Sequence, residues 1–346
     1  RRWQPWRRWW GRRSGRLMIL RLAKRKGGIA MVIVLVVIAA LVVIATGFAF
    51  SMGVETRLVR NTRFNPDLDW LGRSGVELAR YILSKPVPNE ERMDALHQRW
   101  AGGPGRAPGT EDELKAWEQL PLRNVALGQG KFSIKITDRE RKLNINSARP
   151  ELLRHILEFH GEVASTDVDI FLDSLADWID PDDDSRVNGA ESDDYLGEIP
   201  AYYCKNGPLD HISELKMING FKDNPEIYEL FEKYFTTVSG GLVNINTASA
   251  EVIGLLPGME PYLAGEIVNY RSSEFGPFRD LGQLNTPELG APPELISDIR
   301  RYLSTKSATF NVEVTAQIGK DPPRKYRALL RRVTERDIRI LYFHSE

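Results

Sequence analysis

Acidic side chains are concentrated in one stretch of this chain, residues 167–198. That stretch contains twelve aspartates and glutamates and a single base, Arg186. Its densest part also contains glycine, proline and asparagine, which favour sharp turns. Hard divalent cations such as Ca²⁺ bind six to eight oxygen atoms from carboxylates, amides and backbone carbonyls. Cation binding is therefore the first chemistry that the sequence suggests.

Two interpretations of this acidic stretch remain open on the residues alone. It does not follow the EF-hand pattern, because counting from Asp184 places Arg186 at the third position and Tyr195 at the twelfth. A solvated acidic loop on the surface would have the same composition. A cation is favoured by electrostatics, since dense carboxylates beside the apolar Trp178 and Ile179 repel one another and ionise at a cost in free energy.

The sequence contains no recognisable catalytic motif. The patterns of zinc proteases, serine hydrolases and nucleotide-binding loops are absent from it, and its five histidines are scattered. Cys204 is the only cysteine, so no disulfide can form within the chain, and we interpret it as a buried or half-buried structural thiol. Catalytic carboxylates form pairs with distinct environments, unlike a dense acidic loop. We therefore expect a protein that is not an enzyme.

An internal repeat predicts that helical modules position this acidic stretch. The matched segments are residues 143–153 with 243–253, and residues 209–215 with 278–284. Each of the first pair begins with an Asn-Ile-Asn motif followed by a hydroxyl residue, Ser147 or Thr247, which can cap the start of a helix. We therefore expect an all-α region that contains two SAM-like or helix-hairpin-helix-like modules.

The second module, residues 244–278, resembles helix-hairpin-helix DNA-binding domains. In those domains a Gly-x-Gly hairpin offers backbone N–H groups to a phosphate. Here the first glycine is Gly258, and Glu260 occupies the position of the second. Residues 242–304 contain four arginines and eight acidic residues, a net charge of −4. Because nucleic-acid affinity comes mainly from neutralising phosphates, we expect protein contacts and no nucleic-acid partner. A membrane-anchored DNA-uptake protein is the alternative function.

The N-terminal part of the sequence is typical of a membrane anchor. Residues 29–50 contain no charged side chain and would span about 33 Å as a helix, enough for a bilayer core. Residues 1–28 contain eleven basic and no acidic residues, so we expect them in the cytoplasm. A buried core helix would rarely be apolar on all faces, and the apolar region of a cleavable secretory signal is usually shorter.

Alternating segments on both sides of the helical region predict a sheet. Period-two patterns cover residues 131–137, 310–316, 326–333 and 338–343. The helical region begins and ends inside this strand set, so we expect a domain inserted into a sheet domain. The expected parts are a leader (1–28, cleaved), a transmembrane helix (29–50), the first part of the sheet domain (51–141), the inserted domain (142–304) and the C-terminal strands (305–346).

The junction between the leader and the apolar run resembles type IV prepilins. A basic stretch is followed by Gly27 and Gly28 and then by an uninterrupted apolar helix. In prepilins a membrane peptidase cuts after the glycine and the new N-terminus is methylated. The resemblance places the cut between Gly28 and Ile29, with a cut after Gly27 as the alternative. Most pilins have glutamate at mature position five, where this chain has Ile33, as expected of a subunit at the tip.

The whole layout resembles the general secretion pathway protein K family, the K-type minor pseudopilins of type II secretion systems. The resemblance rests on the leader junction, residues 177–180 and 188–191, the paired Asn-Ile-Asn motifs and the large insert. It implies an α+β fold with a type IV pilin-like N-terminal helix, an antiparallel sheet and an inserted all-α domain. It also implies a non-catalytic subunit at the pseudopilus tip that helps to start assembly for the export of folded periplasmic proteins.

The same resemblance implies partners, a location and a cofactor. The partners would be the I- and J-type minor pseudopilins, the major pseudopilin and the prepilin peptidase. The chain would cross the bacterial inner membrane once, with its N-terminus in the cytoplasm and its body in the periplasm. Two calcium ions are implied in the acidic stretch, and the ligands that we expect are Asp180, Asp182, Asp184, Glu191, Asp193 and Asp194.

The leader junction leads to a first prediction. Protein purified from membranes of a host that contains the prepilin peptidase should begin at Ile29 and carry one added methyl group on that residue. Mass spectrometry of the N-terminal peptide checks both features and separates cleavage after Gly28 from cleavage after Gly27. Recovery of the chain with residues 1–28 still attached would contradict the prediction.

Overall fold

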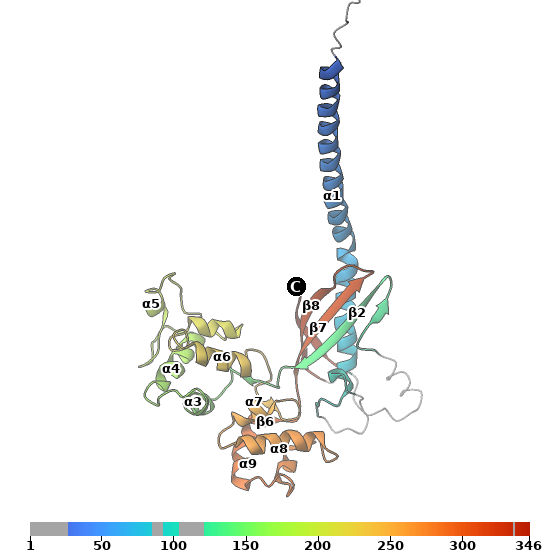
Figure 1. The fold of residues 1–346 in the computed structure, drawn as a ribbon. Helices are drawn as coiled ribbons and strands as arrows, with labels where there is room; N and C mark the ends of the chain where they lie inside the picture. Colours follow the sequence, from blue (N-terminus) through green and yellow to red (C-terminus); the bar gives the residue numbers. More distant parts are fainter. Residues whose placement is uncertain (1–26, 85–92, 104–120, 335) are drawn as a thin grey trace, which may run out of the picture. The chain divides into compact units, whose positions relative to one another are not determined.

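A computed structural model describes residues 27–84, 93–103, 121–334 and 336–346 (Figure 1). The chain divides into two units, residues 1–63 and residues 64–346. The expected leader lies outside the described residues apart from its last two. Gly28 and Ile29 belong to the first turn of helix α1 (Gly27–Ser84), which includes residues of both units.

The first unit contains an apolar helical segment that is fully exposed. Residues Ala30–Gly53 of α1 have a mean hydropathy of 3.1, and none of this segment is buried within the protein. Contact of so much apolar surface with water is unfavourable, at about 25 cal/mol per Å². The segment therefore requires a bilayer or other helices around it. This finding agrees with the membrane anchor expected at residues 29–50, and the side on which each end lies stays a prediction.

The second unit contains the expected antiparallel sheet. Its strands are β1 (Val125–Leu127), β2 (Gly130–Asp138), β7 (Thr309–Ile318), β8 (Arg324–Arg332) and β9 (Ile338–Ser345). They are hydrogen-bonded in the order β1-β2-β7-β8-β9, with each neighbouring pair antiparallel. Four of the five strands follow from the period-two patterns, because alternate residues such as Phe132, Ile134 and Ile136 are buried on one face. The three-residue strand β1 is too short to show such a pattern.

The part of α1 that belongs to the second unit packs on this sheet at very short range. Its buried residues Val76 and Ala79 belong to the same apolar core as the inward-facing strand residues. Two glycines permit the close approach. A Cβ atom on Gly75 would lie 2.5 Å from Cγ1 of Val314, and one on Gly72 would lie 2.7 Å from the ring of Tyr326. Contacts so short cannot form unless the side chain of Val314, the ring of Tyr326 or the helix itself moves.

The interval between β2 and β7 contains two modules that are built alike. The first has β3 (Leu143–Asn144), α3 (Pro150–Phe159), α4 (Val168–Ile179), α5 (Ser192–Tyr195), η2 (Ile212–Met217), α6 (Pro225–Tyr234) and β4 (Phe235–Thr236). The second has β5 (Val243–Asn244), α7 (Ala250–Gly254), α8 (Pro261–Ser272), η3 (Leu281–Asn285), α9 (Pro293–Ile299), η4 (Arg300–Tyr302) and β6 (Leu303–Ser304). In each module the first and last strands form a two-residue parallel pair.

Equivalent asparagines explain why two separate segments match in the sequence repeat. The amide of Asn146 accepts from the N–H of Leu209 at 2.8 Å and donates to the carbonyl of Leu209 at 2.9 Å. Asn246 makes the same two bonds with Phe278, at 2.9 and 2.8 Å. The second asparagine of each Asn-Ile-Asn motif therefore holds the second matched segment of its own module.

The helix caps differ from the sequence prediction. The N-cap of α7 is Ser249, whose hydroxyl accepts from the N–H of Val252, and the N-cap of α3 is Arg149. The prediction that Ser147 and Thr247 occupy these caps is wrong by two residues. Their N–H groups instead close turns on the carbonyls of the first asparagine of each motif, at 3.3 and 3.1 Å, so the helices begin later.

The close approach of α1 to the sheet leads to a second prediction. Gly75→Val should lower the free energy of unfolding by about 1–3 kcal/mol, because the added methyl groups overpack a filled core. Denaturant unfolding of the purified chain in detergent measures this loss. The control is Gly265→Ala in α8, where a Cβ atom meets nothing within 4 Å. It should be neutral or stabilising through helix propensity, and an equal effect of the two substitutions would refute the packing argument.

Candidate functional site

The acidic stretch comprises α4, α5 and the loop between them, and the facing ends of the two helices bring three of its carboxylates together. Asp180 is the C-cap of α4, Glu191 is the N-cap of α5, and Asp182 lies on the loop between them. One oxygen atom from each of these three residues lies within 4.8 Å of the others. Three carboxylates at this separation can act as ligands for a single divalent cation.

Several oxygen atoms around this cluster lack a hydrogen-bond partner among the described residues. They are both carboxylate oxygens of Glu191, Oδ1 of Asp180 and Oδ1 of Asn206. The side chain of Glu191 is buried, which raises its pKa, and the neighbouring acids raise it further. Buried acceptors without donors are unfavourable, and a hard cation is the partner that satisfies several of them at once. The donor set therefore fits a bound cation.

The other three expected ligands lie outside this cluster. The N–H of Asp184 donates to Oδ1 of Asp182 at 3.1 Å, which shapes the loop, while its own side chain is exposed. Oδ2 of Asp194 accepts from the N–H of Glu191 at 3.0 Å and so binds the backbone at the start of α5. Asp193 is exposed in the first turn of α5. The structure thus gathers Asp180, Asp182 and Glu191 and gives the remaining acids other surroundings.

Arg186, the one base in the stretch, binds two of its acids. Nη1 of Arg186 forms ion pairs with the fully buried Asp177 and with Asp180, the latter at 2.5 Å, and these carboxylates raise the pKa of Arg186. The backbone N–H of Arg186 also donates to Oδ2 of Asp177. Gly189 makes room for this arrangement, since a Cβ atom there would lie 1.8 Å from the same oxygen. Sequence reasoning missed this pairing, although a lone base among twelve acids was a signal.

An aromatic cluster anchors the loop to the core of the first module. The rings of Trp178 and Tyr195 meet edge to face at 5.3 Å, and Tyr195 stacks on Tyr202 at 5.2 Å. The hydroxyl of Tyr202 donates to the carbonyl of Met217 at 2.7 Å. Beside them Cys204 is buried, as expected, and burial raises the pKa of its thiol to about 11. The cysteine is therefore a neutral packing residue, and the carboxylate cluster adjoins a packed aromatic core.

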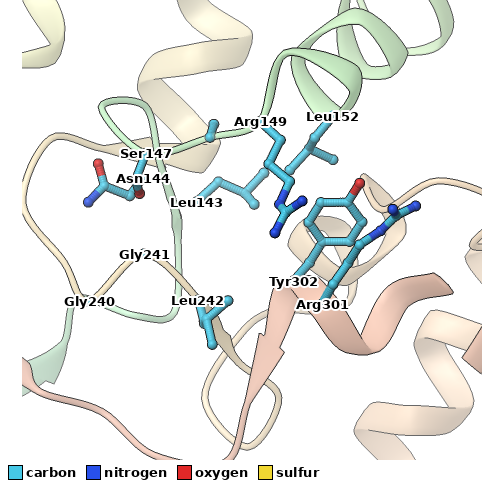
Figure 2. Close-up of a pocket in the computed structure, with 11 residues that line it drawn as sticks. Leu143, Asn144, Ser147, Arg149, Leu152, Gly240, Gly241, Leu242, Arg301 and Tyr302 are labelled. Atoms are coloured by element: carbon cyan, nitrogen blue, oxygen red, sulfur yellow. The ribbon is translucent and has the colours of Figure 1, made fainter. Parts of the chain in front are cut away.

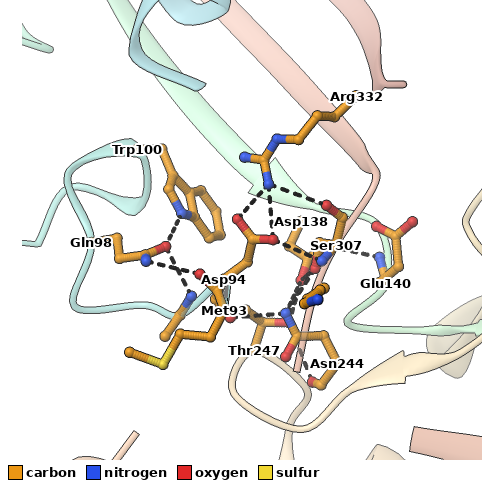
Figure 3. A network of polar contacts seen from close by, with 12 residues as sticks. Met93, Asp94, Gln98, Trp100, Asp138, Glu140, Asn244, Thr247, Ser307 and Arg332 are labelled. Carbon is orange, nitrogen blue, oxygen red and sulfur yellow. Dashed lines mark hydrogen bonds and ion pairs between the residues drawn. The ribbon is translucent and has the colours of Figure 1, made fainter. Parts of the chain in front are cut away.

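A second polar cluster lies where the second module meets the sheet (Figure 3). Nδ2 of Asn244 lies 2.9 Å from the carbonyl of Asp94, 3.3 Å from Oδ2 of Asp138 and 2.7 Å from Oγ of Ser307. Oδ2 of Asp138 also accepts from Ser307 at 2.6 Å and from the hydroxyl of Thr247. The cluster thus joins the end of β2, the segment before β7 and the second module.

Charged groups surround this cluster of Asn244, Asp138, Ser307 and Thr247, which we call the joint. Arg332 on β8 forms an ion pair with Asp94 at 2.8 Å and covers the ring of Phe310 at 4.8 Å from its centroid. The carboxylate of Glu140 accepts from the N–H groups of Gly240 and Thr309, at 2.6 and 3.1 Å. These groups are buried and mutually bonded. Their arrangement holds segments of the chain together and leaves no carboxylate of the joint exposed to a substrate.

Comparisons with known protein families agree with this architecture. The family model described as type II secretion system protein K matches residues 130–239. A model for the helix-hairpin-helix motif matches residues 238–294, which cover most of the second module. The two models meet at the boundary between the modules.

Individual relatives align over longer parts of the chain. Type II secretion system protein K of Pseudomonas aeruginosa is 26% identical over 259 residues, which cover 73% of this chain and 74% of the relative. The protein K of Aeromonas hydrophila is 24% identical and covers 86% of this chain and 90% of its own length. A chain in the crystal structure of the GspK-GspI-GspJ complex from enterotoxigenic Escherichia coli has a TM-score of 0.63 and 19% identity, over 83% of this chain and 99% of that one.

The buried joint leads to a third prediction. Burial, together with the adjacent Glu140, raises the pKa of Asp138 from 3.8 to about 8. The protonated carboxyl group of Asp138 therefore makes its full contribution to the free energy of unfolding below pH 3.8. This contribution is lost as the pH rises toward 8. Asp138→Asn cannot ionise and should remove this part of the pH dependence. The fall in melting temperature between pH 5 and pH 8 should be smaller in the variant than in the unaltered chain.

The matched control for this measurement is Asp298→Asn, which removes an exposed carboxylate. That variant should keep the pH dependence of the unaltered chain. An unchanged difference between the melting temperatures at pH 5 and pH 8 in Asp138→Asn would show that Asp138 is ionised throughout this range.

Proposed function

Because the chain belongs to the type II secretion system protein K family, we propose that it stands at the tip of the pseudopilus and helps to start pseudopilus assembly. The family match supports the role of a minor pseudopilin in type II secretion. The observation that carries the finer proposal is the fully exposed apolar helix of Ala30–Gly53, in a chain whose sequence has no recognisable catalytic motif. Such a helix supplies a surface for assembly.

The apolar part of α1 can serve in two environments in turn. Its valine, leucine and isoleucine side chains are exposed on all sides, which suits lipid before assembly. The same side chains can pack among other helices, where small and branched residues allow close contact. Ile33 occupies the fifth position after the expected cut, so no carboxylate is offered to the N-terminus of a preceding subunit. The first subunit of the pseudopilus has no subunit ahead of it and therefore needs no such carboxylate.

The proposed partners and location follow from the family. A solved relative is part of a complex with GspI and GspJ, which supports I- and J-type pseudopilins as partners of this chain. We extend the proposal to the major pseudopilin, which would add behind the tip, and to the prepilin peptidase, which would remove residues 1–28. The body would lie in the periplasm, with the basic leader in the cytoplasm, in keeping with the charge asymmetry of the chain.

The second module is proposed to contact protein rather than DNA. It matches a helix-hairpin-helix model, and Gly258 has the left-handed backbone that such a hairpin requires. Glu260 occupies the N-cap of α8, where a DNA-binding hairpin would present N–H groups to a phosphate. Together with the net charge of −4, this carboxylate opposes binding of a polyanion.

We also propose that the loop between α4 and α5 binds calcium through Asp180, Asp182 and Glu191. The unpartnered oxygens of Glu191 and Asp180 support this assignment, and Asn206 offers an amide oxygen in the same region. When bound, the ion would neutralise the clustered carboxylates and tie the loop to the ends of both helices. The role is structural, because the cluster lies on an aromatic core and has no paired acid and base of distinct environments.

The fourth prediction tests the role in secretion. Deletion of this protein from its host should abolish export of folded periplasmic substrates while their synthesis and translocation to the periplasm continue. Fractionation of cells and medium measures this, and expression of the intact chain should restore export. Normal secretion in the deletion strain would overturn the assignment.

The fifth prediction tests the calcium site. Free calcium at about 100 times its Kd should stabilise the chain by about 2.7 kcal/mol, and a chelator should lower the melting temperature accordingly. Glu191→Gln should abolish this response. Asp193→Asn removes an acid of the same loop from outside the cluster and should leave the response intact. Loss of the response in both variants would favour the set of six ligands expected from the sequence. A melting temperature unaffected by the chelator would exclude a structural ion.

A further inference from the structure

A cavity of about 200 Å³ lies between segments of the two modules, and two arginines line it (Figure 2). Arg149 stands at the N-cap of α3 in the first module, and Arg301 belongs to η4 in the second. The linker that joins the modules contributes Gly240 and Gly241 to the wall. None of the residues that line this cavity is acidic. The cavity is therefore locally basic on a body whose acidic residues outnumber its basic ones.

Both guanidinium groups are available to a ligand. Within the part of the chain that the structure describes, no carboxylate lies within the 4.0 Å ion-pair distance of either arginine. Arg301 is held by its Nε, which donates to the carbonyl of Asp298 at 3.1 Å, and by the ring of Tyr302, 5.2 Å from the guanidinium carbon. Neither Nη group of Arg301 forms a hydrogen bond or ion pair with a described residue. A side chain that is already oriented loses less entropy on binding.

The size and walls of the cavity restrict the ligand. Small-molecule and cofactor pockets usually measure about 300–1,000 Å³, and this one is smaller. Leu143, Leu152 and Leu242 supply apolar wall beside the two arginines. A ligand with a short apolar chain that ends in a carboxylate could contact the leucines through the chain and the arginines through the carboxylate. Arginine binds carboxylates through parallel, charge-assisted hydrogen bonds.

We propose that this cavity binds the carboxylate of a glutamate side chain that a partner protein presents to the inserted domain. The two methylene groups of glutamate would contact the leucines, and its carboxylate would bind the guanidinium of Arg149 and that of Arg301, which lies against the ring of Tyr302 (Figure 2). Because one arginine comes from each module, binding would also connect the two modules. The inference deepens the proposed function, since it assigns a contact to the domain that we propose as a protein-binding module.

Saturation-transfer NMR on the purified full-length chain in detergent tests this proposal. The probe is the capped peptide acetyl-Ala-Glu-Leu-amide at up to about 10 mM, a range in which a millimolar Kd is measurable. The comparison probes are acetyl-Ala-Gln-Leu-amide, the same glutamine peptide with a free C-terminal carboxylate, and inorganic phosphate. The variants are Arg149→Gln, Arg301→Gln and the control Arg331→Gln, which removes an exposed arginine on β8.

The glutamate peptide should bind the unaltered chain and the Arg331→Gln control with equal affinity. Its affinity for the Arg149→Gln and Arg301→Gln variants should be at least tenfold lower. Melting temperatures of all variants establish that they are folded. Absence of binding, equal binding to all variants, or equal binding of the glutamine peptide would overturn the proposal. Binding of only the free C-terminus or only phosphate would overturn the assignment of a glutamate side chain. The measurement uses the purified chain, so failure here leaves the role in secretion untouched.

Discussion

The pairing of β2 with β7 is the constraint on which the rest of the body depends. Asp138 at the end of β2 faces Phe310 at the start of β7, although about half of the chain separates them. The two ends of the insert are therefore neighbours, and the sheet continues as if the insert were a short loop. The amide of Asn244 and the carboxylate of Asp138 close the base of that loop with buried hydrogen bonds. A buried polar joint of this kind is stable only when each member has a partner.

The two modules show how one motif serves two purposes. The second asparagine of each Asn-Ile-Asn motif bonds within its own module in the same way. The first asparagine does not, because Asn144 donates to the carbonyl of Ser239 in the linker, whereas Asn244 donates into the joint with the sheet. The second module is thereby tied to the sheet through its asparagine, and the first module carries the long acidic loop.

Charge in this protein acts locally rather than through the net value of zero. The acidic loop contains a base that pairs with its most buried acid, Asp177, and so leaves a smaller cluster with unpartnered oxygens. The cavity between the modules has the opposite character, with two arginines and no acid in its wall. Both features lie in the inserted part of the chain. The insert therefore provides the polar recognition surfaces, and α1 provides the apolar one.

The sequence by itself determined the features that depend on local composition and periodicity. The apolar run at residues 29–50, the strands around Phe132 and Val314, and the paired Asn-Ile-Asn motifs follow from neighbours along the chain, because the side-chain period of a helix or strand is set by its own backbone. The tertiary structure alone decided which of the six expected acids converge: Asp180, Asp182 and Glu191 do, whereas Asp194 accepts from the backbone N–H of Glu191. It also revealed Arg186 beside Asp177, and the glycines that admit α1 to the sheet. Such contacts join residues whose separation is set by where helices end and how they pack, and no local pattern records that information.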